Sequence, residues 1–258
     1  MVNLILGGNV MTVGGKTRAF TLVELLVVIS IIALLMAILL PALQRARGEA
    51  YELFCMSILR NLSLAHKQYL ADTGKYLPHT SYDPSDPSGL MSCPWYDNDY
   101  FRRSLGLPLV SPEDKKKRLS DIQEWKANVP RKFICPAASY AIKHPEEGLY
   151  PIDRSYGVNV DGDYYAAIGR VSDLLDKEGW VKRPSEKLFM ADALDWWIGY
   201  AFCKKYPEFG ENWVGYDTYG MTAYRHYDRV NLLYWDGHCG QLPGDEVMNS
   251  PGLWDPLK

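Results

Sequence analysis

Four residues close to the C-terminus could do chemistry together. His226 and Asp236 are separated by nine residues, and Gly237 and His238 follow directly. Imidazole and carboxylate groups are common zinc ligands and common proton carriers in catalysis. These residues therefore define a candidate metal site or acid/base pair. The alternative is that both histidines lie at strand ends and hydrogen-bond to backbone. The spacing lacks the helical His-x-x-x-His presentation of a zinc protease.

A second group of oxygen-bearing side chains could bind a cation. Asn159, Asp161 and Asp163 alternate along the chain, as they do at the start of a calcium loop. The rest of that pattern is missing, because Tyr164 stands where glycine is needed and Arg170 where the bidentate glutamate belongs. We expect no cofactor, with calcium at these three residues as the exception that we consider. The alternative for them is a turn rich in Asx residues.

The five cysteines are too scattered for a C-x-x-C zinc pair: Cys55, Cys93, Cys135, Cys203 and Cys239. In an exported domain an even subset could form disulfides, with one cysteine left over. The chain carries no nucleophile elbow, phosphate loop, dinucleotide fingerprint or HExxH motif. We therefore expect a protein that is not an enzyme, and keep an anchored hydrolase that uses His226, Asp236 and His238 as a third hypothesis.

Short strands separated by turns are expected to position these residues. The predicted strands are residues 132–134, 155–160, 187–191, 230–235 and 238–242. A short helix is predicted over 172–178, with Ser172 as its N-cap and Gly179 as its terminator. Asp236-Gly237 between the last two strands predicts a two-residue hairpin turn of type I′.

A longer helix precedes these strands. Cys55, Ile58, Leu62, Ala65 and Tyr69 recur at steps of three and four residues, which indicates an amphipathic helix. Polar residues occupy the opposite side. The sequence Asp72-Thr73-Gly74 supplies a stop, because glycine readily adopts the left-handed conformation that ends helices.

The composition excludes several classes of protein. The 258 residues include 28 basic and 31 acidic side chains, a net charge of -3 that gives no indication of nucleic-acid binding. The basic run 115–118 lies beside acidic residues and is interpreted as a solvated face. The aromatic clusters at 95–96, 196–197 and 213–219 could line a carbohydrate platform, or could be core and interface residues, which we favour.

The average charge conceals one apolar segment. Residues 20–43 form a run of 24 residues, which as a helix spans roughly 36 Å and exceeds the hydrocarbon core of about 30 Å. Lys16 and Arg18 precede it, so the positive-inside rule places the N-terminus in the cytoplasm. Glu24 is unexpected here, because placing an acidic side chain in a membrane-spanning helix costs free energy. Such residues usually have a function.

The sequence Ala19-Phe20-Thr21-Leu22-Val23-Glu24, the aliphatic run and Pro41 together form a pattern. It resembles the class III signal of type IV pilins and type II secretion pseudopilins. In that family phenylalanine follows the cut, glutamate stands at the fifth mature position and proline often at the twenty-second. The family has glycine before the cut, where this chain has the similarly small Ala19.

The resemblance implies a biogenesis pathway and a set of partners. A prepilin peptidase would cut between Ala19 and Phe20 and methylate the new amine. Glu24 would pair with the amine of a neighbouring subunit during assembly by the inner-membrane machinery. Pro41 would kink or locally melt the helix. The implied domains are a leader (1–19), a transmembrane segment (20–43), its amphipathic continuation (44–74) and an exported domain (75–258).

A second resemblance covers most of the remaining chain. The His226-x9-Asp236-Gly237 spacing is similar to the H-x9-DG signature of a domain found behind prepilin-type leaders, chiefly in planctomycete-like bacteria. Pieces around Cys55, residues 133–136, 155–159 and 187–192 match it in order. The resemblance implies export and processing but no reaction.

Together these features predict an α+β fold with a long N-terminal helix packed on a domain with an antiparallel sheet, as in pilins. The leading hypothesis is a pilin- or pseudopilin-like subunit. It would be single-pass in the inner membrane, with the C-terminal domain outside the cytoplasm or in a surface or periplasmic filament. The alternative is a membrane-anchored protein that binds glycans or other polymers and does not polymerise.

Overall fold

The computed structural model describes about two thirds of the chain. The described residues are 21–74, 76, 80–82, 92–109, 130–143, 154–161, 179, 181–204, 206–210 and 220–258. The chain divides into two compact units, residues 1–46 and 47–258. Of the predicted features, the 172–178 helix, the basic run 115–118 and the aromatic cluster 213–219 lie outside the described residues.

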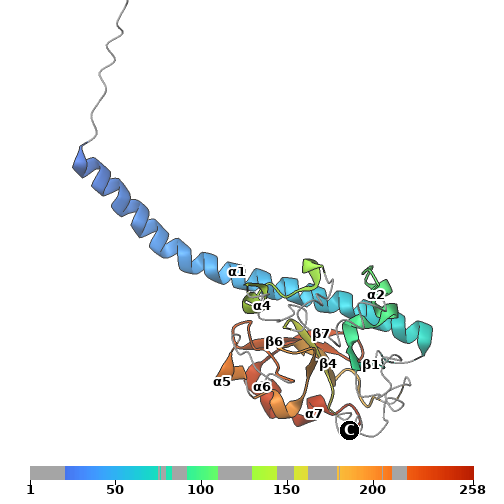
Figure 1. Cartoon of the computed structure of the whole chain (residues 1–258). Helices are drawn as coiled ribbons and strands as arrows, with labels where there is room; N and C mark the ends of the chain where they lie inside the picture. Colours follow the sequence, from blue (N-terminus) through green and yellow to red (C-terminus); the bar gives the residue numbers. More distant parts are fainter. Residues whose placement is uncertain are drawn as a thin grey trace, which may run out of the picture. The chain divides into compact units, whose positions relative to one another are not determined.

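The helix α1 spans Leu22–Thr73 (Figure 1). It begins with a capping box formed by Thr21 and Glu24. The Glu24 carboxylate accepts hydrogen bonds from the Thr21 N–H at 2.9 Å and the Thr21 hydroxyl at 2.8 Å. The Glu24 N–H in turn donates to the Thr21 Oγ1 at 3.2 Å. This reciprocal pattern satisfies donors that the first helical turn leaves unpaired. Glu24 therefore has a structural role in starting the helix, which sequence reasoning missed.

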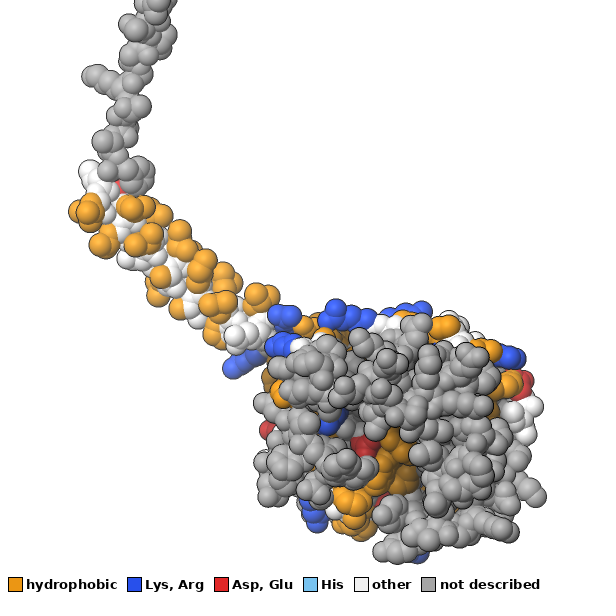
Figure 2. Space-filling view, in the orientation of Figure 1, with side chains coloured by type: hydrophobic (Ala, Val, Ile, Leu, Met, Phe, Trp, Pro, Cys, Tyr) orange, Lys and Arg blue, Asp and Glu red, His pale blue; other side chains and the backbone are white. Residues whose placement is uncertain are grey.

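The first unit contains the apolar segment of α1. Its side chains are exposed on all sides from Leu22 to Leu43, and Figure 2 shows hydrophobic groups along its visible face. By length and composition α1 is the one helix among the described residues that could cross a membrane. An apolar surface of this extent needs lipid or other helices around it.

Pro41 lies inside α1, and the helix continues through it. The helix is therefore not melted at Pro41 in this structure, and a kink at this position stays a prediction. Proline removes one N–H donor and crowds the preceding turn, but a membrane helix can tolerate that loss where the freed carbonyl finds other partners.

The second half of α1 is amphipathic, as predicted. Cys55, Ile58, Leu62 and Ala65 are buried, and Tyr69 packs at the edge of the same core. The helix ends at Thr73, and Gly74 follows with a φ of 70° and an N–H bonded to the Leu70 carbonyl. The predicted stop is confirmed.

A five-stranded sheet forms the centre of the second unit, in the order β5-β3-β4-β6-β7. The strands are β3 (Tyr156–Asn159), β4 (Leu188–Asp192), β5 (Trp197–Ile198), β6 (Arg229–Tyr234) and β7 (Cys239–Pro243). Neighbours are antiparallel except β3 and β5, which pair in parallel. The α+β architecture is confirmed, with a mixed sheet in place of a purely antiparallel one.

Four of the predicted strands are present within about one residue, and one prediction is wrong. Residues 132–134 do not form a strand, because Arg131–Phe133 is a 3₁₀ turn, η2. Pro130 precedes it, and the Phe133 N–H bonds back to the Pro130 carbonyl at 2.9 Å. This turn directs the Phe133 ring into the core, where it is 6% exposed.

The turn between β6 and β7 also differs from the prediction. The Tyr234 N–H donates to the His238 carbonyl at 3.0 Å, and the Gly237 N–H donates to the Tyr234 carbonyl at 2.8 Å. The loop therefore has three residues, and of these only Gly237 has a positive φ, 88°. This is the pattern of a three-residue hairpin that ends in a left-handed glycine. The extra residue allows Trp235 to enter the core, where it is 4% exposed.

Shorter elements complete the second unit. A two-stranded ribbon pairs β1 (Thr80–Tyr82) with β2 (Ser92–Pro94). The remaining short helices are η1 (Trp95–Asp97), α2 (Asp99–Ser104), α4 (Ser139–Lys143), η6 (Tyr200–Phe202), α5 (Tyr206–Phe209), α6 (Gly244–Asn249) and α7 (Pro251–Trp254).

The sheet is the middle of three layers. Along β6, Leu233 belongs to the core shared with α1, whereas Val230 and Leu232 belong to the core shared with Val247 and Trp254 of α6 and α7. Figure 1 shows the part of α1 that belongs to the second unit, residues 47–73, on one face of the sheet and α6 and α7 on the other. Strand residues alternate between faces, so both faces of this strand are apolar.

Candidate functional site

Four side chains that could bind a metal or take part in a reaction meet between α1 and the sheet. Cys55 comes from α1, Cys135 follows η2, Asp192 ends β4 and His226 precedes β6. All four are buried, with exposures of 0 to 3%. We refer to them as the buried cluster.

The geometry of the buried cluster is compact. The Cys55 and Cys135 sulfurs are 2.6 Å apart. The His226 Nε2 lies 3.7 Å from the Cys135 sulfur and 3.5 Å from the Asp192 Oδ2. One ligand atom from each of the four residues lies within 4.8 Å of every other.

Local backbone structure holds the two residues from the sheet side. The Asp192 Oδ2 accepts the Asn231 N–H at 2.8 Å, which ties β4 to β6 at this point. His226 and Arg229 exchange two backbone hydrogen bonds across a tight turn. Both central residues, Tyr227 and Asp228, have positive φ, as a type I′ turn requires. The turn type predicted for Asp236-Gly237 therefore occurs at the other end of β6.

The groups in the buried cluster shift one another's pKa values. Burial alone raises the pKa of the Cys135 thiol, but the hydrogen bond from Cys55, the His226 imidazole and the Arg225 guanidinium outweigh it and lower that pKa. The pKa of Cys55 rises, because its thiol donates a hydrogen bond to Cys135 and because burial disfavours the thiolate. Burial raises the pKa of Asp192 to about 7. Burial lowers the pKa of His226, but Cys135 and Asp192 outweigh burial and raise it.

The geometry of the buried cluster decides which reactions its residues could carry out. A cysteine, a histidine and an aspartate in contact suggest a nucleophile with its base. In such a triad the acid binds the imidazole nitrogen opposite the nucleophile. Here Cys135 and Asp192 both approach the Nε2 of His226, so the relay geometry is absent from the buried cluster. Two chemistries remain for these residues, metal coordination and oxidation of the thiol pair.

The structure separates the residues of the predicted C-terminal site. His226 lies in the buried cluster, before β6, whereas Asp236 and His238 lie in the hairpin loop after it. The strand between them has six residues, or roughly 20 Å. Asp236 and His238 pair with each other at 2.6 Å on the surface. The predicted joint site is therefore wrong, because β6 holds its two ends apart.

Gly237 is explained by its neighbours. Its carbonyl accepts the Ser63 hydroxyl at 2.6 Å, and a Cβ at this position would lie 2.1 Å from the Lys67 Cε. The hairpin loop therefore rests directly on α1. The positive φ of 88° favours glycine here, and a Cβ would in addition displace the Lys67 side chain.

Two of the candidate calcium residues, Asn159 and Asp161, form an Asx turn. The Asn159 Oδ1 accepts the Asp161 N–H at 2.9 Å, and the Asn159 amide donates to the carbonyls of Leu188 and Trp254 at 2.9 and 2.7 Å. The Asp161 carboxylate accepts the Tyr200 N–H, and burial raises its pKa to about 6. These oxygens and donors already serve the fold. Asp163 lies outside the described residues, as do Ala19 and Phe20.

The aromatic clusters that the structure describes belong to the core. Trp95 and Tyr96 are 1% and 2% exposed, Trp197 is 9% exposed, and Trp196 packs against the core at its edge. A carbohydrate platform needs an exposed aromatic face. The core interpretation is therefore confirmed for these residues.

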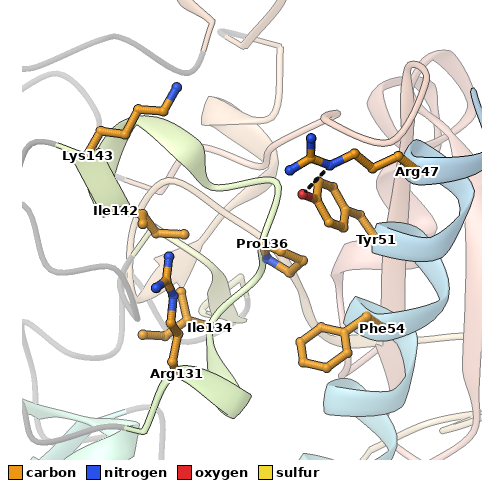
Figure 3. Close-up of a pocket in the computed structure, with 8 residues that line it drawn as sticks. All are labelled: Arg47, Tyr51, Phe54, Arg131, Ile134, Pro136, Ile142 and Lys143. Carbon is orange, nitrogen blue, oxygen red and sulfur yellow. Dashed lines mark hydrogen bonds between the residues drawn. The ribbon is translucent and has the colours of Figure 1, made fainter. Parts of the chain in front are cut away.

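A pocket of about 680 Å³ opens at the start of the second unit (Figure 3). Arg47, Tyr51 and Phe54 of α1 line one wall, and Arg131 and Lys143 lie across from them. The Arg47 Nε donates to the Tyr51 hydroxyl at 2.7 Å. The lining residues that the structure describes carry three cations and no carboxylate, which suits an anionic group.

Comparison with known proteins identifies a family motif near the N-terminus. Residues 15–40 match the prokaryotic N-terminal methylation motif. The chain carries a prepilin-type signal. The motif and the apolar helix α1 indicate a pilin-like, membrane-anchored substrate of a prepilin peptidase. No curated protein and no solved structure matches the chain. The H-x9-DG resemblance stays a prediction.

Sequence reasoning missed the buried cluster as a site. Cys55 lies on the predicted apolar face of its helix, but no sequence pattern pairs it with Cys135, which is 80 residues away. A weak signal was available, because Cys55, Cys135, Asp192 and His226 all fall within the pieces that resemble the H-x9-DG domain.

Proposed function

We propose that this chain is a pilin- or pseudopilin-like subunit that assembles through α1 into a filament. The observation that carries the proposal is the methylation motif at residues 15–40, which leads directly into a helix that is apolar on every side. After membrane insertion with the N-terminus inside, cleavage between Ala19 and Phe20 would create an amine next to Thr21. The proposal assigns no reaction to the chain, and its partners are the peptidase, the assembly machinery and other subunits.

The capping box sharpens the proposed role of Glu24. In the single chain the Glu24 carboxylate is occupied by the Thr21 N–H and hydroxyl. A neighbour's amine would attract the same carboxylate, because an unpaired charge within a membrane is costly. Glu24 would therefore serve two functions, as a helix cap in the free subunit and as the partner of an amine in the filament.

Two substitutions separate these functions. Glu24→Gln keeps an oxygen that accepts the Thr21 N–H but removes the charge, whereas Thr21→Ala removes the capping hydroxyl and keeps the charge. We expect Glu24→Gln to insert into the membrane and be processed but to give no filaments, and Thr21→Ala to assemble. Filaments of Glu24→Gln in normal amount would contradict the pairing role.

Processing is tested independently. Mass spectrometry of the N-terminus should find N-methylated Phe20, and an intact leader would contradict processing. A processed wild-type chain that never forms filaments, by electron microscopy or cross-linking, would instead favour the anchored polymer-binding alternative.

A further inference from the structure

The two cysteines of the buried cluster are closer than unbonded groups should be. Their sulfurs are 2.6 Å apart, whereas unbonded heavy atoms are most stable at about 3.5–4.0 Å and sulfur is larger than carbon. Both side chains are fully buried, and neither can turn toward solvent without opening the core between α1 and the sheet.

We propose that Cys55 and Cys135 form a disulfide in the mature protein. The bond would fasten α1 to the segment after η2, across 80 residues of chain. The inference rests on the proposed function for one point, export, because disulfides persist outside the cytoplasm and are rare within it.

The surroundings favour Cys135 as the first thiol to react. The His226 Nε2 lies 3.7 Å from its sulfur, close enough to take the thiol proton and stabilise the thiolate. The thiolate attacks one sulfur of a disulfide oxidant, and the oxidant's other sulfur leaves as a thiol. Cys55 then loses its proton and attacks Cys135 in the mixed disulfide, which releases the oxidant's second thiol. In total the protein loses two electrons and two protons, and the oxidant gains both, before the core closes over the sulfurs.

The competing occupant of these residues is a metal ion. Two thiolates, a carboxylate and an imidazole could form a tetrahedral zinc site. Two thiolates on one tetrahedral zinc, with Zn–S bonds of about 2.3 Å, stand roughly 3.7 Å apart. The cysteine sulfurs are more than an ångström closer than that, so the geometry favours a bond between them.

The test uses the full chain in detergent. The protein is reduced and unfolded, then refolded with reduced and oxidised glutathione, alkylated in urea without reductant so that buried free thiols react, digested and analysed by mass spectrometry. We expect one cross-linked peptide pair joining Cys55 to Cys135, two hydrogen masses lighter than the separate peptides. Cys203 is the internal control, because its thiol donates to the Tyr200 carbonyl at 3.0 Å and should be alkylated.

Two results would overturn the proposal. One is alkylation of both Cys55 and Cys135 after refolding. The other is retention of one zinc per chain, with both thiols protected until a chelator is added, when zinc is included. The refolding does not depend on the cell compartment, so failure of the disulfide is distinguishable from failure of export. Export is read separately from the N-terminal mass and from protease access to the domain in intact cells.

Discussion

His66 provides a quantitative test of how the core treats an ionisable group. Its side chain is fully buried on α1, with its ring 4.2 Å from that of Phe189 and stacked at 5.8 Å on Tyr76. Neither ring nitrogen meets a hydrogen-bonding group among the residues that the structure describes. Burial lowers the pKa of His66 from 6.5 to about 3, and Lys67 adds to the effect.

The sign and size of the effect on stability follow from linkage. Between pH 6.5 and 3 the unfolded chain binds a proton at His66 and the folded chain does not, so acid favours unfolding. At 1.36 kcal/mol per pKa unit, the folded state loses about 2 kcal/mol between pH 8 and pH 5, and about 4 kcal/mol by pH 3. The loss of stability at pH 5 depends almost entirely on the pKa of His66 in the unfolded chain. Any folded-state pKa below about 4 therefore gives the same loss of about 2 kcal/mol.

The experiment compares wild type with His66→Leu. Both full-length chains are unfolded by urea in detergent at pH 8 and pH 5, with tryptophan fluorescence as the signal. Acidic groups contribute equally to both chains, so the difference between the two pH effects isolates His66. We expect the variant to lose about 2 kcal/mol less than wild type. The control is His238→Gln, because that side chain is 48% exposed and its loss should change stability little.

Parallel pH dependences for wild type and His66→Leu would refute this reasoning. They would mean that the folded protein solvates or pairs the imidazole as well as water does. A larger pH effect in the variant would contradict the sign of the pKa shift.

Three further predictions concern the hairpin loop and the buried cluster. Gly237→Ala should destabilise the protein by more than Gly74→Ala, for which roughly 1–2 kcal/mol is expected. Both glycines have a positive φ, but only Gly237 faces side chains of α1. Urea unfolding of the two variants measures the difference. If Cys55 and Cys135 are bonded, reductant should lower the free energy of unfolding by about 4–5 kcal/mol for a closure of 80 residues. The double alanine variant should not respond to reductant. Asp192→Asn should become more stable relative to wild type as pH rises from about 4 to about 7, because burial raises the wild-type pKa from 3.8 to about 7 and ionising the carboxylate disfavours the folded state.

Periodic features were predicted well from the sequence. The apolar run and the steps of three and four residues predicted α1, and Gly74 predicted its end to the residue. Strands β3, β4, β6 and β7 were recognised as short segments bounded by turns, of which β4 and β6 are mainly apolar. These are local patterns, and one helix face or one strand is sufficient to produce them.

Predictions that depended on neighbours elsewhere in the chain were wrong. Residues 132–134 have the composition of a strand, but a proline-initiated turn carries Phe133 into the core. The hairpin needed three loop residues because Trp235 had to reach the core.

The sequence by itself determined the anchor, the prepilin-type signal and the sequence of main elements, because apolar length and spacing are properties of contiguous residues. Only the tertiary structure decided which polar residues meet. It placed His226 with Cys55, Cys135 and Asp192, and left Asp236 and His238 on the surface. The reason is the sheet. A strand of six residues holds its two ends apart, while pairing between β4 and β6 and packing of α1 bring together side chains up to 171 positions distant, as the residue numbers of Cys55 and His226 show.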